Sequence, residues 1–276
     1  MIEAKTFDGK LSIFKKRRNS FLLYFVVIAV VTALSSLITN FDWGASVTSF
    51  PKAFAWLIAN SVPSEASLKL LPSILFKLWQ TVLISIMSTV IAAILAFGLA
   101  LLGARPTRPN LVFSTVVRGI ASFFRNIPVA AWAMIFLFSF GQSMFTGFLA
   151  IFVESFGFLV RSFIEVIDES SESSVEGLRA TGANYSQIIV QAVIPSVKPL
   201  ILSWMLFQVE SNIRSATLVG ILTGSGIGFA FDLYYKNVVP GTLAYNYPAA
   251  AMVVIAIVVV VLLIEAVSNK IRRVIL

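Results

Sequence analysis

The sequence predicts an all-α, polytopic membrane protein with about six transmembrane helices. Of its 276 residues, 58% are hydrophobic and 12% are charged, and the mean hydropathy is +0.91. An ordinary soluble domain is roughly 45–50% apolar and about 25% charged. The apolar residues also form long uncharged blocks, close in length to the about 20 residues with which a helix crosses the hydrocarbon core. A lipid bilayer therefore determines the layout of this chain.

The chain contains no cysteine and no histidine. Disulfides, thiol chemistry and metal sites built on these residues are therefore excluded. No paired-carboxylate active site stands out, so we expect no catalytic residue, no metal and no cofactor in this chain. The formal charge of +8 is a feature of many nucleic-acid-binding proteins. Here the basic residues cluster at the ends of apolar blocks, where membrane topology places them, and we expect no nucleic-acid partner.

The first apolar block follows a strongly basic segment. Residues 1–19 contain six Lys and Arg, and residues 20–41 contain no charged residue. Basic flanks stay in the cytoplasm, so we expect residues 1–19 to be a cytoplasmic segment and residues 20–276 to form one transmembrane domain. Binding of anionic lipid is a second role open to this flank. The block exceeds the roughly 7–15-residue core of a signal peptide, so we expect it to span the membrane uncleaved.

Five further spans are predicted from the lengths of the apolar blocks. Residues 42–72 are expected outside, with a short interfacial helix at 53–59, and residues 232–240 form another outside connection. Because Pro128 lacks an amide proton, it should kink the third span or restart it. Six crossings leave both termini on one side, and the excess of Lys and Arg there predicts that this side is the cytoplasm. The five spans are residues 74–104, 111–140, 148–167, 195–219 and 247–267.

The longest polar stretch between spans covers about residues 168–188, DESSESSVEGLRATGANYSQI. Ser173 or Ser174 is expected to cap a short helix, and Gly182 to end it. A compact helical knob of this kind can dock into a groove on a partner protein. The alternative is an ordinary polar loop between two spans. In either case the acidic side chains are expected to form a solvated face, namely Asp168, Glu169, Glu172 and Glu176.

The stretch from Glu176 to Pro195 resembles the cytoplasmic loop shared by permeases of bacterial ATP-binding cassette (ABC) importers. That pattern has Glu-Ala-Ala, a glycine a few residues later, and a closing Ile-x-Leu-Pro. Glu176, Gly182 and Pro195 take the matching places, whereas Gly177 and Leu178 depart from the two alanines. The resemblance implies that this segment couples the chain to a separate ATPase. The coupling residues would be Glu176, Gly177, Leu178, Ala180, Thr181, Gly182 and Ala183.

Two further segments resemble the phosphonate and phosphite importer permeases within that group. The sequence RNIP at 125–128 looks like their Arg-x-Ile-Pro element, and ESNIRSATLVG at 210–220 is similar to their fifth-helix segment. The resemblance implies type I importer permease topology in the bacterial inner (plasma) membrane. It also implies a phosphorus oxyanion as cargo. The implied partners are a second permease copy, two ATPase subunits that bind ATP and Mg, and an extracytoplasmic substrate-binding protein.

Several charged residues fall inside predicted spans, where an ionisable side chain is costly and faces protein or water. Glu210 and Arg214 are four residues apart in the favourable acid-first order. They either neutralise one another and hold the bundle together, or Arg214 lines an anion path, for which its guanidinium fork is suited. Arg161 and Glu154 share a helix face without pairing and allow the same two interpretations. The candidate path residues are Arg161, Glu210, Asn212, Arg214, Ser215 and Thr217.

Two other groups of residues receive simpler interpretations. Arg118 and Arg125 are expected to snorkel to the inner interface. The glycines at 220, 224, 226 and 228 do not fit a GxxxxGK[ST] phosphate loop and follow a membrane helix instead of a strand. We therefore expect no ATP hydrolysis by this chain, and a flexible or closely packed backbone beside a membrane cavity.

Three alternatives stay open on the sequence alone. The first is an ABC importer permease for another small solute. The second is a self-contained channel or secondary transporter that uses the intramembrane charges for ion coupling. That class predicts inverted repeats with broken helices at matching positions, and the sequence shows no such symmetry. A membrane enzyme is the third alternative, and the small catalytic inventory disfavours it.

Overall fold

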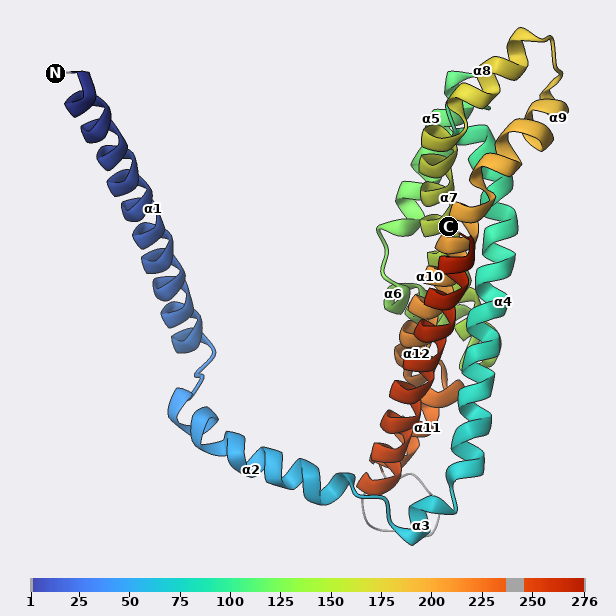
Figure 1. The fold of residues 1–276 in the computed structure, drawn as a ribbon. Helices are drawn as coiled ribbons and strands as arrows, with labels where there is room; N and C mark the ends of the chain where they lie inside the picture. The colour runs from blue at the N-terminus through green and yellow to red at the C-terminus, as the bar shows by residue number, and fades with distance from the viewer. Residues whose placement is uncertain (1, 237–245, 276) are drawn as a thin grey trace. The chain divides into compact units, whose positions relative to one another are not determined.

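The computed structural model describes residues 2–236 and 246–275, and every regular element in these ranges is a helix (Figure 1). The chain divides into two units, residues 1–59 and 60–276. In the first unit, α1 covers Ile2–Ile38 and includes an apolar candidate span at Arg17–Ile38. This confirms the first predicted span, although the helix ends before Phe41, because the chain turns at Asn40, whose φ is 51°.

The helix α2 covers Trp43–Ser61, and it is much longer than the short helix predicted at 53–59. Pro51 lies inside it. It is the ninth residue of the helix, beyond the first turn, so its missing amide removes one backbone hydrogen bond of the helix and favours a kink there. No residue of α2 is buried.

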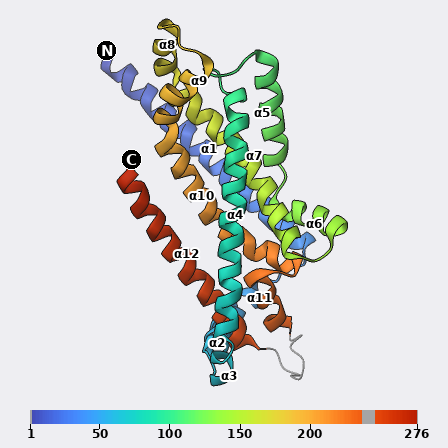
Figure 2. The same cartoon turned by 90° about the vertical axis from the view of Figure 1, so that its right-hand side faces the viewer.

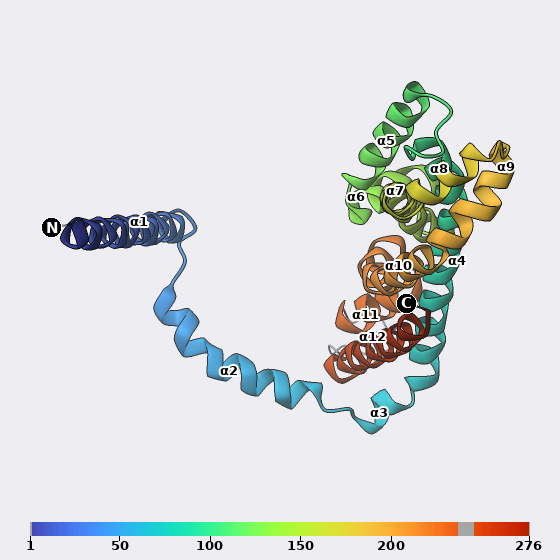
Figure 3. The same cartoon turned by 45° about the horizontal axis from the view of Figure 1, so that its top comes forward.

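The second unit is a bundle around α4, which covers Leu71–Gly103 and is preceded by the short α3 (Glu65–Leu68). α4 packs along α7 (Met144–Ser170), and α10 (Ile194–Thr223) lies between α7 and α12 (Tyr247–Ile275) in Figure 3. Ala92, Ala96 and Ala100 on α4 are fully buried in one apolar cluster with Leu159 and Phe163 of α7. Small side chains let two helix backbones approach closely, which is how helices associate in lipid.

The third predicted span is a sharply bent pair of helices. α5 covers Leu111–Arg125 and α6 covers Val129–Phe140, and their axes meet at 86°. Pro128 stands at the N-cap of α6, which confirms that it restarts the helix. The bend allows α7 to approach the end of α5 so closely that a Cβ added at Gly157 would lie 2.8 Å from the Arg125 nitrogen.

The span count agrees with the prediction of about six. In the described residues, five helices are long and apolar enough to cross a membrane, and the bent α5–α6 pair makes up to six. The fourth, fifth and sixth predicted spans are confirmed by α7, α10 and α12, each of which extends beyond its predicted range. Five short or connecting elements complete the unit. They are α3, α8 (Glu172–Ala180), α9 (Tyr185–Gln187), a π-helical turn (Ile188–Val193) and α11 (Gly226–Lys236).

The outside connection predicted at 232–240 begins within a helix, and its position outside the membrane stays a prediction. Residues 232–236 belong to α11, and residues 237–245 lie outside the described ranges. The helix forms because Ile227, Ala230 and Tyr234 recur at helical spacing and pack into a buried apolar cluster with Ile74 of α4 and Val253 of α12. Because polar residues end this short segment, its helical periodicity was not recognised from the sequence.

The glycine-rich stretch before α11 is closely packed. A Cβ added at Gly228 would collide with the Thr217 carbonyl oxygen, and one added at Gly220 with the Ser225 carbonyl oxygen. Only glycine allows two backbone segments to approach this closely. Gly224 has φ 66° and ends α10 in the left-handed conformation. A cavity of about 10 Å³ lies beside this stretch, the size of one water molecule.

Candidate coupling surface and intramembrane charges

The polar stretch at 168–188 folds into two short helices, α8 and α9, at the end of the bundle that also holds the first turns of α5 (Figure 1, Figure 2). Val175 is fully buried, whereas Glu176 and Arg179 on the same helix are exposed. α8 is therefore amphipathic, with one face fixed to the bundle and the other free.

The predicted cap of α8 is wrong. The helix begins at Glu172 after Ser171, so that Ser173 and Ser174 lie inside its first turns. Ser171 makes no side-chain cap, because its hydroxyl donates a hydrogen bond to the Ile167 carbonyl of α7 at 2.7 Å. Glu172 stabilises the start of α8 in place of a side-chain cap, since a carboxylate in the first turn is favourable at the positive end of the helix dipole.

The prediction that Gly182 ends this helix is confirmed. Gly182 has φ 79°, a conformation that favours glycine. Its amide donates to the Arg179 carbonyl at 3.0 Å, and the Ala183 amide donates to the Leu178 carbonyl at 3.3 Å. Asn184 then caps α9 with a capping box that Gln187 completes.

The seven predicted coupling residues lie together on this knob. Leu178 and Ala183 are half-buried and pack against the apolar cluster of α4 and α7. The other five are exposed, namely Glu176, Gly177, Ala180, Thr181 and Gly182. Their arrangement gives a rigid apolar base and an exposed, mostly small-residue surface, a shape that suits docking into a groove on another protein.

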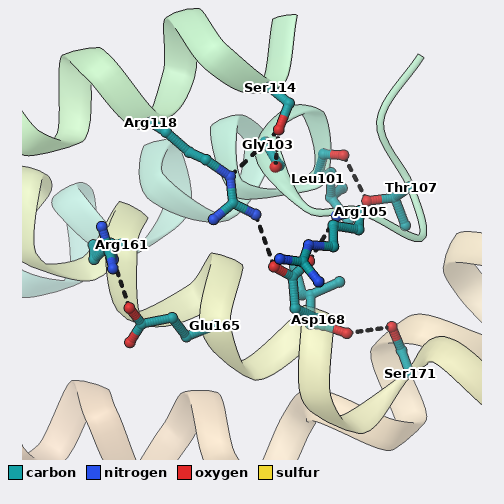
Figure 4. A network of polar contacts seen from close by, with 11 residues as sticks. Leu101, Gly103, Arg105, Thr107, Ser114, Arg118, Arg161, Glu165, Asp168 and Ser171 are labelled. Carbon is teal, nitrogen blue, oxygen red and sulfur yellow. Dashed lines mark hydrogen bonds and ion pairs between the residues drawn. The ribbon is translucent and has the colours of Figure 1, made fainter. Parts of the chain in front are cut away.

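The expectation of a solvated acidic face is wrong for Asp168, which is only 18% exposed and pairs with Arg118. The expectation that Arg118 snorkels to the inner interface stays a prediction. Figure 4 shows Asp168 at the end of α7 facing the guanidinium of Arg118 on α5, and the ion pair measures 2.7 Å. The other carboxylate oxygen of Asp168 accepts the backbone N–H of Arg105 at 2.6 Å. The sequence offered one sign of this ion pair, because Arg118 and Asp168 carry opposite charges near the ends of two apolar segments. It does not show that these segments are neighbours in space.

Both arginines among the candidate path residues, Arg161 and Arg214, form ion pairs within their own helices. Glu210 accepts a hydrogen bond from Arg214 at 2.6 Å, as the four-residue spacing predicts. Arg272 of α12 lies 3.8 Å from the second oxygen of Glu210 and was not predicted to contact it. Arg161 pairs with Glu165 on α7 at 2.5 Å (Figure 4).

Glu154 does not pair with Arg161, as predicted, and it joins a buried polar network between helices instead. The amide of Gln208 on α10 donates to Glu154 at 3.2 Å and to the Asn212 side-chain oxygen at 3.0 Å. Asn212 in turn donates to the hydroxyl groups of Ser155 on α7 at 2.7 Å and Thr89 on α4 at 2.9 Å. This network joins α4, α7 and α10.

The candidate path residues on α10 point in different directions. Asn212 and Arg214 differ by two positions, about 200° around a helix of 3.6 residues per turn. Asn212 is fully buried, whereas 47% of the Arg214 side chain is exposed. Ser215 and Thr217 are half-buried. The chain thus uses Asn212 between its own helices and leaves Arg214 on an accessible face, so a path role for Arg214 stays a prediction.

A bundle of apolar helices, with an exposed helical knob between two of its spans, places the chain in the class of multi-pass membrane proteins. The chain belongs to the family of binding-protein-dependent transport system inner membrane components, whose model matches residues 94–275. It is therefore a multi-pass inner-membrane protein. Among its described residues, no group of three or more potential ligands is placed to hold a metal ion.

Similar proteins carry transport names. The phosphate-import permease protein PhnE of Mycolicibacterium smegmatis is 29% identical over 71% of this chain, and the match covers 36% of that protein. The phosphite transport system permease protein PtxC of Stutzerimonas stutzeri is 28% identical, over 70% of this chain and 68% of that protein. These matches confirm the predicted resemblance to phosphonate and phosphite importer permeases.

The fold also matches a solved ABC transporter. A chain of the MetNI methionine ABC transporter in an inward-facing conformation superimposes with a TM-score of 0.64 at 20% identity, covering 77% of this chain and 99% of that chain. This likeness confirms the predicted all-α permease fold with type I importer topology.

Proposed function

We propose that this chain is the permease of an ABC importer that carries a phosphorus oxyanion across the inner membrane. One observation carries the proposal: a helix–glycine–helix knob, α8 and α9, projects between two spans in a chain that belongs to a binding-protein-dependent transport family. The chain itself supplies no phosphate loop, so a partner ATPase would bind ATP and Mg. An extracytoplasmic binding protein would deliver the cargo.

The cargo class is supported by two independent facts. Relatives over about 70% of the chain are named for phosphate and phosphite transport. Arg214, on an exposed face of α10, presents a guanidinium whose planar donors match a tetrahedral oxyanion. If Arg214 turned from Glu210 to a cargo anion, Arg272, 3.8 Å from the same carboxylate, would remain as the cationic neighbour of Glu210.

The assembly is also part of the proposal. The superposition covers 99% of one chain of the MetNI methionine ABC transporter. By analogy, we expect two copies of this chain to enclose the path, with one ATPase docked on each α8. The excess of Lys and Arg near both termini supports a cytoplasmic position for them. The α8–α9 knob then lies on the cytoplasmic side, where ATP is available.

The test is uptake by proteoliposomes that contain this chain and its ATPase, with ATP inside and the binding protein outside. Phosphonate, phosphite, phosphate and an amino acid are compared as substrates. ATP-dependent uptake of a phosphorus oxyanion supports the proposal. Uptake of the amino acid alone leaves the importer mechanism and removes the cargo assignment, whereas uptake that is indifferent to ATP contradicts the importer function and favours a secondary transporter.

A further inference from the structure

Two side chains bind the backbone of the turn between α4 and α5, one from α8 and one from the end of α7. From α8, the Nη2 atom of Arg179 donates a hydrogen bond to the carbonyl oxygen of Pro106 at 2.5 Å. From the end of α7, the carboxylate of Asp168 accepts the N–H of Arg105 at 2.6 Å. Two consecutive residues of the turn are therefore bound by two side chains, one at the end of α7 and one in the last turn of α8.

The turn is also tied to the helices that it connects. The hydroxyl of Thr107 donates to the Leu101 carbonyl at 2.6 Å, and the hydroxyl of Ser114 donates to the Gly103 carbonyl at 2.7 Å (Figure 4). Both hydroxyl-bearing residues are at most 3% exposed. The end of α4, the turn and the start of α5 thus form one hydrogen-bonded piece, because solvent does not compete for these bonds.

Asp168 connects this piece to the side of α5. Its second oxygen pairs with Arg118 at 2.7 Å, and Arg118 also donates through Nε to the Ser114 hydroxyl at 3.3 Å. The side chains of Arg118 and Asp168 are 32% and 18% exposed. Hydrogen bonds between charged groups are shorter and stronger than neutral ones. The carboxylate of Asp168 binds both α5, through Arg118, and the α4–α5 turn, through Arg105.

We propose that Asp168 is a positioning residue that makes α5 and the α4–α5 turn move as one body with α8. The proposal rests on the proposed docking of an ATPase on α8. The chain connects α8 covalently to α7 and, through α9 and the π-helical turn, to α10. The contacts of Asp168 and Arg179 add a second route, which carries a displacement of α8 to α5 and on to the 86° bend between α5 and α6.

The ion pair of Arg161 and Glu165 is a contact within a single helix. Arg161 and Glu165 are both on α7 (Figure 4), so their bond stabilises one helix and joins nothing else. The pair of Asp232 and Lys236 on α11 has the same intrahelical geometry at 2.8 Å. Asp232→Asn is therefore a matched control for Asp168→Asn, since both remove one carboxylate charge from an ion pair.

The first experiment measures uptake and ATP hydrolysis separately in the assembled transporter. Asp168→Asn should reduce the cargo taken up per ATP hydrolysed by at least about fivefold, the lower end of typical couplings between distant sites. Asp232→Asn should leave this ratio unchanged. Arg179→Gln removes the second contact at an exposed residue and should lower the ratio in the same direction, so it decides the question if Asp168→Asn does not fold. Unchanged ratios in both variants overturn the proposal.

The second experiment follows the movement directly. The chain has no native cysteine, so spin labels can be attached at Thr115→Cys on α5 and Ser173→Cys on α8, which are both exposed positions. The distance between the labels should stay constant between nucleotide-free and ATP-bound transporter, and it should change with nucleotide in Asp168→Asn. A nucleotide-dependent distance in the unmodified background overturns the proposal. Absence of ATP-dependent uptake in that background contradicts the proposed function instead.

Discussion

The guanidinium of Arg272, near the end of α12, lies 3.8 Å from the carboxylate of Glu210 in the middle of α10. The same carboxylate bonds Arg214 one helical turn further along at 2.6 Å. Glu210 is only 12% exposed, so one carboxylate balances two arginines in a place where uncompensated charge is costly. This relationship joins two spans that are distant in the sequence, and it makes Glu210 the most sensitive member of the group.

Replacing Glu210 with Gln should destabilise the bundle. The change leaves two guanidinium groups facing each other without a carboxylate. We expect a loss of roughly 1–3 kcal/mol, between the values for exposed and buried ion pairs. Thermal unfolding of the detergent-solubilised protein, followed by tryptophan fluorescence, measures it. Arg272→Gln removes only the longer contact and should cost less than about 1 kcal/mol; an equal loss in both variants would make Arg272 the main partner.

Replacing Arg214 with Lys separates the two interpretations of this charge. Lysine keeps the charge and the pairing with Glu210 but loses the planar fork of donors. If Arg214 lines the anion path, the rate of uptake at saturating loaded binding protein should fall roughly tenfold, the equivalent of one lost charge-assisted hydrogen bond. The unfolding temperature should not change. A fall in stability with normal uptake would assign Arg214 to bundle packing alone.

Asn212 is expected to act on stability and not on transport. Asn212→Leu removes its three side-chain hydrogen bonds to Thr89, Ser155 and Gln208. At about 0.6 kcal/mol for each bond between membrane helices, the loss should be roughly 2 kcal/mol. Thermal unfolding checks this value, with Ser155→Ala as a partial deletion that should cost less. A change in cargo selectivity with normal stability would return Asn212 to the path.

Replacing Gly182 with Asp should uncouple ATP hydrolysis from uptake. Any side chain at φ 79° is strained, at a cost of about 1–2 kcal/mol, and a carboxylate adds charge and bulk to the exposed docking surface. No atom lies within 4 Å of an added Cβ, so Gly182→Ala carries the backbone strain without a steric clash and serves as the control. ATPase and uptake rates are compared in proteoliposomes. Full coupling in Gly182→Asp would contradict the docking role of this turn.

The sequence predicted best what depends on local properties of the chain. Five apolar stretches and the restart at Pro128 correspond to observed helices, because the length of an apolar run and the missing amide of proline act within one segment. The same holds for the end of α8 at Gly182 and for the Glu210–Arg214 pair, which depend on one turn of helix. The family resemblance could also be recognised from the residues between Glu176 and Pro195.

Other features depended on which helices become neighbours. The sequence predicted a solvated carboxylate at Asp168, whereas the structure packs Arg118 of α5 against it. The sequence likewise did not indicate that Asn212 bonds to α4 and α7, and its role in the path stays a prediction. The start of α8 also shifted because Ser171 bonds back to α7 and Val175 must be buried. The sequence by itself determined the spans, the polar knob and its family, whereas the tertiary structure decided the partner of each buried polar group, because such partners come from other helices.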